Sequence, residues 1–184
     1  MLNTRFFVLV GIILAAAAFR LIPHPANVTP IAAMALFGGA YFTSRMTALA
    51  VPLAAMALSD LVLALLGTDV VLLMPYVYGS FVATTCLAPW LVRPRRSPVR
   101  IATATLASSV LFFLVTNFGA WLAFPIYAKT WDGLVECYIA GIPFFRHTLA
   151  GDVVCSVVLF GGFALAERYV AALREKATPV QATT

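Results

Sequence analysis

Charged residues are scarce in this sequence. Only 10% of its 184 residues are Asp, Glu, Lys or Arg, whereas 62% are hydrophobic and the mean hydropathy is +0.98. A soluble domain carries about 25% charged and about 45–50% apolar residues, so an ordinary soluble domain is excluded. The composition predicts an all-α integral membrane protein embedded in the lipid bilayer. Its length suits one domain of about five to seven helices of ~20 residues, over residues 1–172, followed by a polar cytoplasmic tail at 173–184.

Motifs that carry chemistry are also missing. The three cysteines, Cys86, Cys137 and Cys155, show neither CxxC nor metal-ligand spacing, so we expect no disulfide framework and no metal site. Phosphate-loop, HExxH and nucleophile-elbow motifs are absent. We therefore expect neither an enzyme nor a cofactor. The net charge of +5 does not indicate nucleic-acid binding, because the basic residues sit in short connections.

One short stretch concentrates the residues that the rest of the chain lacks. Residues 20–30, RLIPHPANVTP, hold three prolines together with Arg20, His24 and Asn27. Proline lacks an N–H and restricts the residue before it, so a regular helix is excluded here. A rigid polar link between two apolar runs predicts part of a ligand site at one face of the membrane.

The apolar runs predict a bundle of six transmembrane helices. We expect them at about 5–19, 31–42, 46–66, 71–92, 101–124 and 147–169. Residues 125–146, PIYAKTWDGLVECYIAGIPFFR, are expected to form the longest loop. Within it, residues 131–138 predict at most a short interfacial helix, because Trp and Tyr favour the headgroup zone.

Basic residues are divided unequally between the two sides of this arrangement. The side with both termini and the second and fourth connections holds nine Lys and Arg, and the other side holds Arg20, Lys129 and Arg146. The positive-inside rule predicts that both termini are cytoplasmic (N-in/C-in) and that the protein is a multi-pass protein of the inner membrane. The link at 20–30 then faces outside.

Three polar residues of the predicted helices fall in the outer half of the membrane. At 1.5 Å per residue, Asp60 and Asn117 lie about 21 and about 25 Å from the cytoplasmic end, and Asp152 lies about 9 Å from the outer end. A carboxylate inside the membrane is costly unless it faces the bundle interior or a cavity. We therefore predict an outward pocket, with Arg20 as the expected partner of Asp60 or Asp152.

Two sets of site residues follow from this arrangement. The predicted substrate-binding residues are Arg20, His24, Asn27, Asp60, Tyr78, Asn117, Trp121 and Asp152. Tyr78 and Trp121 suit either pocket walls or an aromatic belt. The polar residues also suit a buried clamp between helices without a ligand, or a proton relay. The small residues Gly11, Ala15 and Ala18 predict close helix packing, either within the bundle or against a partner protein.

Three sequence blocks resemble a family of small bacterial six-helix membrane proteins of unassigned function. They are RLIPHPANVTPIAAMALFGGAYF, PLAAMALSDLVLALLG, and TNFGAWL with TWDGLVECYIAGIPFFRHTLAGD. That family in turn resembles the S-components of energy-coupling-factor (ECF) transporters, above all the cobalamin-specific type. The resemblance implies an outward vitamin pocket and docking of Gly11, Ala15 and Ala18 onto an ECF-type scaffold subunit with ATPase subunits. The cobalt-ligating cysteine expected near the start of the fourth helix has no counterpart in residues 67–75.

The predicted function is capture of a small polar or vitamin-like ligand from outside, for uptake with an ATP-driven partner module. Two alternatives stay open. A membrane scaffold of an envelope-assembly complex predicts stable protein partners without a ligand. An ion-coupled carrier predicts uptake without ATP.

Overall fold

The computed structural model describes residues 3–22, 28–67, 74–93 and 96–175, and these residues are helical almost throughout. The helices are α1 (Thr4–Phe19), α2 (Ile31–Tyr41), α3 (Arg45–Leu65), α4 (Met74–Leu91), α5 (Pro98–Ala123), and a continuous helix made of α6 (Trp131–Ser156), η1 (Val157–Gly161) and α7 (Gly162–Tyr169), followed by the turn η2 (Ala171–Leu173). The all-α class is confirmed. The predicted bounds of the first, second, third and fifth helices are correct within a few residues, and the predicted start of the fourth at 71 lies outside the described residues.

Membrane character is visible in the helices themselves. Three of them are long and apolar enough to cross a membrane, namely α3, α5 and the continuous helix from Trp131 to Tyr169. The apolar helices α1 and α2 are shorter, with 16 and 11 residues. Large apolar side chains are exposed along the long helices, for example Leu61 at 57% and Val157 at 68%. Exposed apolar surface on this scale indicates contact with lipid, and hence a membrane protein.

Helix α2 forms the centre of the bundle. Every one of its residues is buried, and α1, α3, α4, α5 and α6 all contact it. Its glycine pair explains the tight fit. A Cβ atom at Gly38 would lie 2.5 Å from the ring of Pro52 on α3, and one at Gly39 would lie 2.5 Å from the backbone oxygen of Thr85 on α4. The two glycines therefore let α3 and α4 approach the α2 backbone on different sides.

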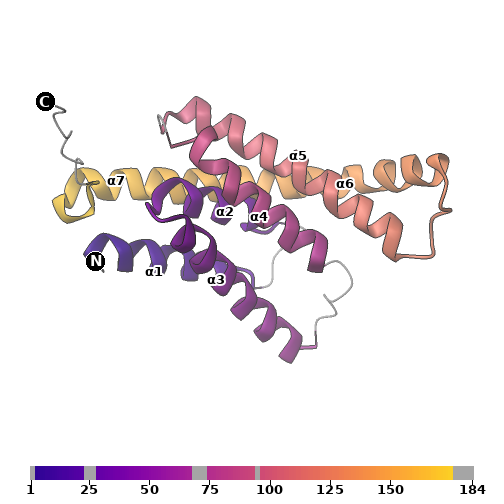
Figure 1. Cartoon of the computed structure of the whole chain (residues 1–184), viewed down its shortest axis with the longest axis horizontal. Helices are drawn as coiled ribbons and strands as arrows, with labels where there is room; N and C mark the ends of the chain where they lie inside the picture. The colour runs from indigo at the N-terminus through magenta and orange to yellow at the C-terminus, as the bar shows by residue number, and fades with distance from the viewer. Residues whose placement is uncertain (1–2, 23–27, 68–73, 94–95, 176–184) are drawn as a thin grey trace, which may run out of the picture.

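The prediction of a long loop at 125–146 is wrong. Figure 1 shows that α6 continues through η1 into α7, along the whole length of the molecule, with α5 antiparallel beside it. Only residues 124–130 connect α5 to α6. The continuous helix has 39 residues, about 58 Å at 1.5 Å per residue, which is about twice the thickness of the hydrocarbon core.

Small residues at every fourth position explain why this segment is helical. Gly133, Cys137 and Gly141 are buried on one face of α6. Cys137 and Gly141 pack against α5, and Gly133 packs against the backbone of Ala128 in the α5–α6 connection. A Cβ atom at Gly141 would overlap with Oδ1 of Asn117 and lie 2.9 Å from the ring of Phe113, both on α5. Such close helix packing is typical of small residues four apart. It outweighs the polar and aromatic character of the segment, which had predicted a loop.

The first and last described parts of the chain meet at one end of the bundle. Arg5 on α1 donates a hydrogen bond of 2.9 Å to Glu167 on α7 and another to the carbonyl of Leu173 in η2. Leu173 is itself buried. The predicted cytoplasmic location of this end rests on the distribution of charge alone and stays a prediction.

Candidate functional site

A buried ion pair joins three helices near the end of α1. Arg20 follows the last residue of α1, and its Nη2 donates a hydrogen bond of 2.5 Å to Oδ1 of Asp60 on α3. The hydroxyl of Tyr78 on α4 donates to the other carboxylate oxygen at 2.7 Å. The Nη1 atom of Arg20 donates to the hydroxyl of Ser59. Arg20 and Asp60 are only 8% and 5% exposed. Of the two partners expected for Arg20 from the sequence, Asp60 and Asp152, the structure pairs it with Asp60.

One N–H donor of this polar network has no acceptor among the described residues. Nε of Arg20 is buried and has no hydrogen-bond partner among the residues that the structure describes. A buried guanidinium N–H without a partner costs free energy, because it has lost its bonds to water. The network therefore has an unused donor next to the link at 20–30.

Asp152 lies in a second polar cluster, between α5 and α6. Ser109 on α5 donates a hydrogen bond of 2.7 Å to Oδ2 of Asp152, which is 1% exposed. One helical turn along, Thr105 donates to the hydroxyl of Ser156 at 3.0 Å. Within the described residues, Oδ1 of Asp152 has no hydrogen bond of normal geometry. The cluster ties α5 to α6 and is separate from the network of Arg20, Asp60 and Tyr78.

The two clusters nevertheless lie at a similar depth. Asp60 is 15 residues along α3, and Asp152 is 15 residues before Glu167, so each lies about 22 Å from the end of the bundle that holds Arg5. The start of α2 lies near Asp152. The adjacent Gly151 packs against the backbone of Val28 and Thr29, just before α2 begins at Ile31. The polar side chains thus form a layer at the level where α2 starts inside the bundle.

Removing the Ser109 hydroxyl tests the second cluster. Ser109→Ala leaves the Asp152 carboxyl group without its donor from α5, so we expect a loss of about 1–2 kcal/mol in the free energy of unfolding in detergent. Ser80→Ala is the matched control, since the Ser80 hydroxyl donates only to the Tyr76 carbonyl of its own helix. Equal unfolding curves for the two variants would show that Asp152 does not depend on Ser109.

Asn117 and Trp121 belong to neither of these two clusters and lie in the hairpin formed by α5 and α6. The side-chain amide of Asn117 donates to the Phe113 carbonyl one turn earlier at 2.8 Å. Asn117 also lines a cavity of about 260 Å³ between the two helices, together with Gly141. The indole N–H of Trp121 donates to the Ala128 carbonyl at 2.8 Å, in the short α5–α6 connection. The hydrogen bonds of both side chains stay within the hairpin.

The remaining predicted site residues divide into two groups. His24 and Asn27 lie outside the described residues. Gly11, Ala15 and Ala18 are all exposed on α1, and a Cβ atom at Gly11 would meet no atom within 4 Å. This stripe is therefore not used for packing inside the bundle and is open to lipid or a partner helix.

Several residues of these clusters were missed by sequence reasoning. Thr105 and Ser109 are four apart on α5, and Asp152 and Ser156 are four apart on α6. This reciprocal spacing places each pair on one helix face and is a signal that sequence reasoning can use. The pairing of Arg5 with Glu167 had no such signal, because these residues are 162 positions apart.

Comparison with known proteins gives one result. A family of unknown function, DUF6580, matches residues 1–174 of the chain. No curated protein and no solved structure matches it.

Proposed function

The chain belongs to this family of unknown function, and we propose from the geometry of its structure that it is a membrane-embedded substrate-binding protein. It would capture a small polar or vitamin-like ligand for uptake with an ATP-driven partner, in the manner of an ECF S-component. The sequence has no phosphate-loop motif, so ATP hydrolysis falls to the partner.

The observation that carries this proposal is the buried network of Arg20, Asp60 and Tyr78. It offers a cation, a carboxylate and a phenol at one place, and Nε of Arg20 adds a donor that no described residue uses. The network adjoins the proline-rich link at 20–30. Interrupted helices with polar side chains inside the bundle are typical of transporter binding sites.

A second feature supports a role together with a partner protein. The exposed stripe of Gly11, Ala15 and Ala18 lies on α1, the helix that ends at Arg20. Small residues let a partner helix approach closely. Docking on α1 would therefore act on the helix that carries the central arginine of the binding site.

The test begins with the ligand itself. The purified protein is denatured, and the small molecules released from it are identified by mass spectrometry. Tyr78→Phe removes one hydroxyl that donates to a charged group, so we expect it to weaken binding of the identified molecule about tenfold. Tyr138→Phe is the control, since the Tyr138 hydroxyl donates to the Leu114 carbonyl within the α5–α6 hairpin. Wild-type affinity in a well-folded Tyr78→Phe variant would contradict the assignment of this site.

A membrane scaffold is the second candidate function. It is favoured by the fact that the polar side chains of the two clusters bond mainly to one another across helices, as a structural clamp would. A scaffold predicts that pull-downs recover envelope-assembly proteins and that no small molecule is released. Uptake into liposomes under an ion gradient without ATP would instead support an ion-coupled carrier.

A further inference from the structure

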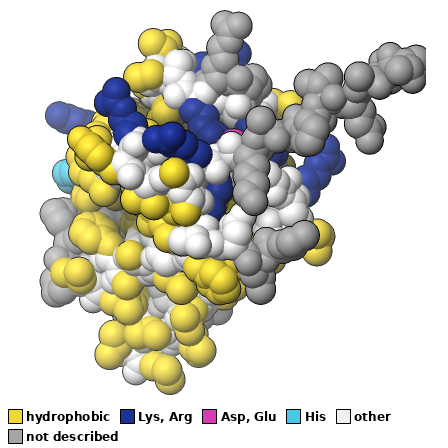
Figure 2. Space-filling view, turned by 90° about the vertical axis from the view of Figure 1, so that its left-hand side faces the viewer, with side chains coloured by type: hydrophobic (Ala, Val, Ile, Leu, Met, Phe, Trp, Pro, Cys, Tyr) yellow, Lys and Arg dark blue, Asp and Glu magenta, His cyan; other side chains and the backbone are white. Residues whose placement is uncertain are grey.

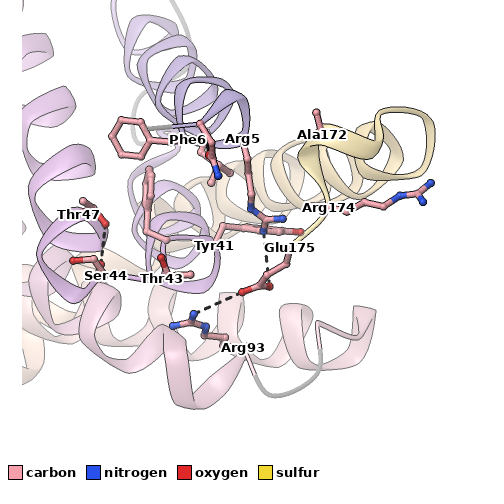
Figure 3. Close-up of a pocket in the computed structure, with 13 residues that line it drawn as sticks. Arg5, Phe6, Tyr41, Thr43, Ser44, Thr47, Arg93, Ala172, Arg174 and Glu175 are labelled. Atoms are coloured by element: carbon pink, nitrogen blue, oxygen red, sulfur yellow. Dashed lines mark hydrogen bonds and ion pairs between the residues drawn. The ribbon is translucent and has the colours of Figure 1, made fainter. Parts of the chain in front are cut away.

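A cavity of about 510 Å³ opens at the other end of the bundle, where α1, α3 and the residues after α7 meet. Arg5, Arg93, Arg174 and Glu175 line it, and Figure 3 shows the guanidinium groups of Arg5 and Arg93 directed toward Glu175. Figure 2 shows that basic side chains gather on this face of the molecule, whereas acidic ones are hardly visible there. Arg5 and Arg20 are 15 residues apart on α1, so this cavity lies about 22 Å from the network of Arg20.

Glu175, which lines this cavity, faces three guanidinium groups, those of Arg5 and Arg93 from the cavity lining and that of Arg96 beside it. Oε2 of Glu175 accepts a hydrogen bond of 2.7 Å from Arg96, and it lies 3.9 Å from Nη2 of Arg5. Oε1 lies 3.8 Å from Nη2 of Arg93. Burial alone would raise the pKa of Glu175, but the hydrogen bond from Arg96 and the positive charges of the arginines lower it overall. Glu175 is therefore an anion at neutral pH, and it does not balance the positive charge around it.

Arg5 is the most constrained of these cations. It is 8% exposed, and its Nη1 is satisfied by Glu167 and the Leu173 carbonyl. Arg5 lines the cavity, and its Nη2 is buried and has no hydrogen-bond partner among the described residues. An unbonded N–H of a buried guanidinium is costly. A stronger acceptor than the distant Glu175 carboxylate would remove that cost.

The N-terminal end of α3 borders the same cavity. Ser44 is the N-cap residue of this helix, and both Ser44 and Thr47 line the cavity. The Ser44 side chain makes no capping hydrogen bond, so it does not satisfy the first amides of the helix. The N-terminus of a helix attracts anions through these amides and through the helix dipole. The cavity thus combines guanidinium groups with an uncapped helix end.

We propose that this cavity is a binding site for a phosphate-bearing anion, supplied by a phospholipid headgroup or by a soluble phosphate ester, and that Glu175 occupies the site when the anion is absent. A phosphate group presents several oxygens and more charge than a carboxylate, so it can bond to Arg5, Arg93 and Arg96 together. Glu175 then competes with the ligand for the same guanidinium groups. Replacing Glu175 therefore strengthens binding of the anion, whereas replacing one of the arginines weakens it.

The test measures binding to the full-length protein. Inorganic phosphate is titrated by calorimetry in neutral detergent, and phosphatidylglycerol retention is measured by native mass spectrometry after transfer from phosphatidylcholine nanodiscs doped with that lipid. We expect Arg93→Gln to weaken binding at least about tenfold, which is about 1.4 kcal/mol. We expect Glu175→Gln to strengthen it by a similar factor. Arg45→Gln is the control, since it removes the same charge from an exposed residue near this end that does not line the cavity.

Opposite effects of the Arg93 and Glu175 variants cannot arise from unfolding, which weakens binding in both. Binding of inorganic phosphate alone assigns a soluble ester, and retention of phosphatidylglycerol alone assigns a lipid headgroup. Binding of both supports the shared phosphate chemistry. The proposal is overturned if neither probe binds, if Glu175→Gln does not strengthen binding, or if Arg45→Gln weakens binding as much as Arg93→Gln does.

Discussion

Replacement of Asp60 by asparagine is expected to destabilise the protein by about 3–5 kcal/mol, the usual cost of removing one partner of a buried ion pair. The variant would leave the Arg20 guanidinium group buried beside a neutral amide, without its charged partner. The Arg20 and Asp60 side chains are only 8% and 7% exposed, and water cannot replace the lost charge. Unfolding of the purified protein in detergent, followed by circular dichroism during heating or SDS titration, measures the effect.

The control for this variant is Asp132→Asn, the same chemical change at an exposed position in the first turn of α6. Its cost should stay below about 1 kcal/mol, the value for a carboxylate near a helix N-terminus. A double variant, Arg20→Met with Asp60→Leu, removes both charges and is expected to recover most of the lost stability. If Asp60→Asn unfolds like Asp132→Asn, the ion pair does not hold α1 to α3.

A single methyl group at Gly39 is expected to destabilise the bundle by about 1–3 kcal/mol. In Gly39→Ala the new Cβ atom would lie 2.5 Å from the Thr85 backbone oxygen and 2.6 Å from Cβ of Ala88. Both atoms belong to α4 and neither can rotate away, so α4 has to move from α2, and such overpacking costs about this much. Because α2 contacts most other helices, the effect should appear as a lower unfolding temperature of the whole protein.

Gly79→Ala on α4 provides the comparison. A Cβ atom at Gly79 meets no atom within 4 Å, and alanine favours a helix over glycine by up to about 1 kcal/mol. We therefore expect Gly79→Ala to be neutral or stabilising in the same unfolding assay. Equal losses in the two variants would show that the close approach of α2 and α4 does not limit stability.

Local sequence patterns were sufficient for most helices and for one contact of the site. Apolar runs and proline positions placed α1, α2, α3 and α5, because these signals act within a few residues. Arg20 was matched with Asp60 or Asp152 because all three were expected in the outer half of the membrane, and a buried carboxylate needs a partner. The same arithmetic of helix rise placed Asp60 and Asp152 at similar depth.

The same patterns failed where contacts between helices outweigh local preference. The stretch 125–146 begins at Pro125 and mixes aromatic with charged residues, which favoured a loop. It is helical because the small residues Gly133, Cys137 and Gly141 allow close packing, Gly133 against Ala128 of the α5–α6 connection and the other two against α5. The depth of a residue along a helix also does not show to which side of the helix its side chain points. Asn117 therefore shared the predicted pocket with Asp60, yet its hydrogen bonds lie in the α5–α6 hairpin.

Composition and hydrophobic periodicity by themselves determined that this is an all-α membrane protein in which Arg20 needs a buried carboxylate as its partner, either Asp60 or Asp152. Only the tertiary structure decided how the polar residues divide into separate clusters, and that Arg5, Arg93 and Arg96 gather around Glu175. The physical reason is that the free-energy cost of burying a polar side chain depends on that residue alone. The need for a partner can therefore be recognised from the sequence. The choice of partners depends on how helices far apart in sequence rotate against one another, and the fit of small residues such as Gly39 and Gly141 fixes that rotation.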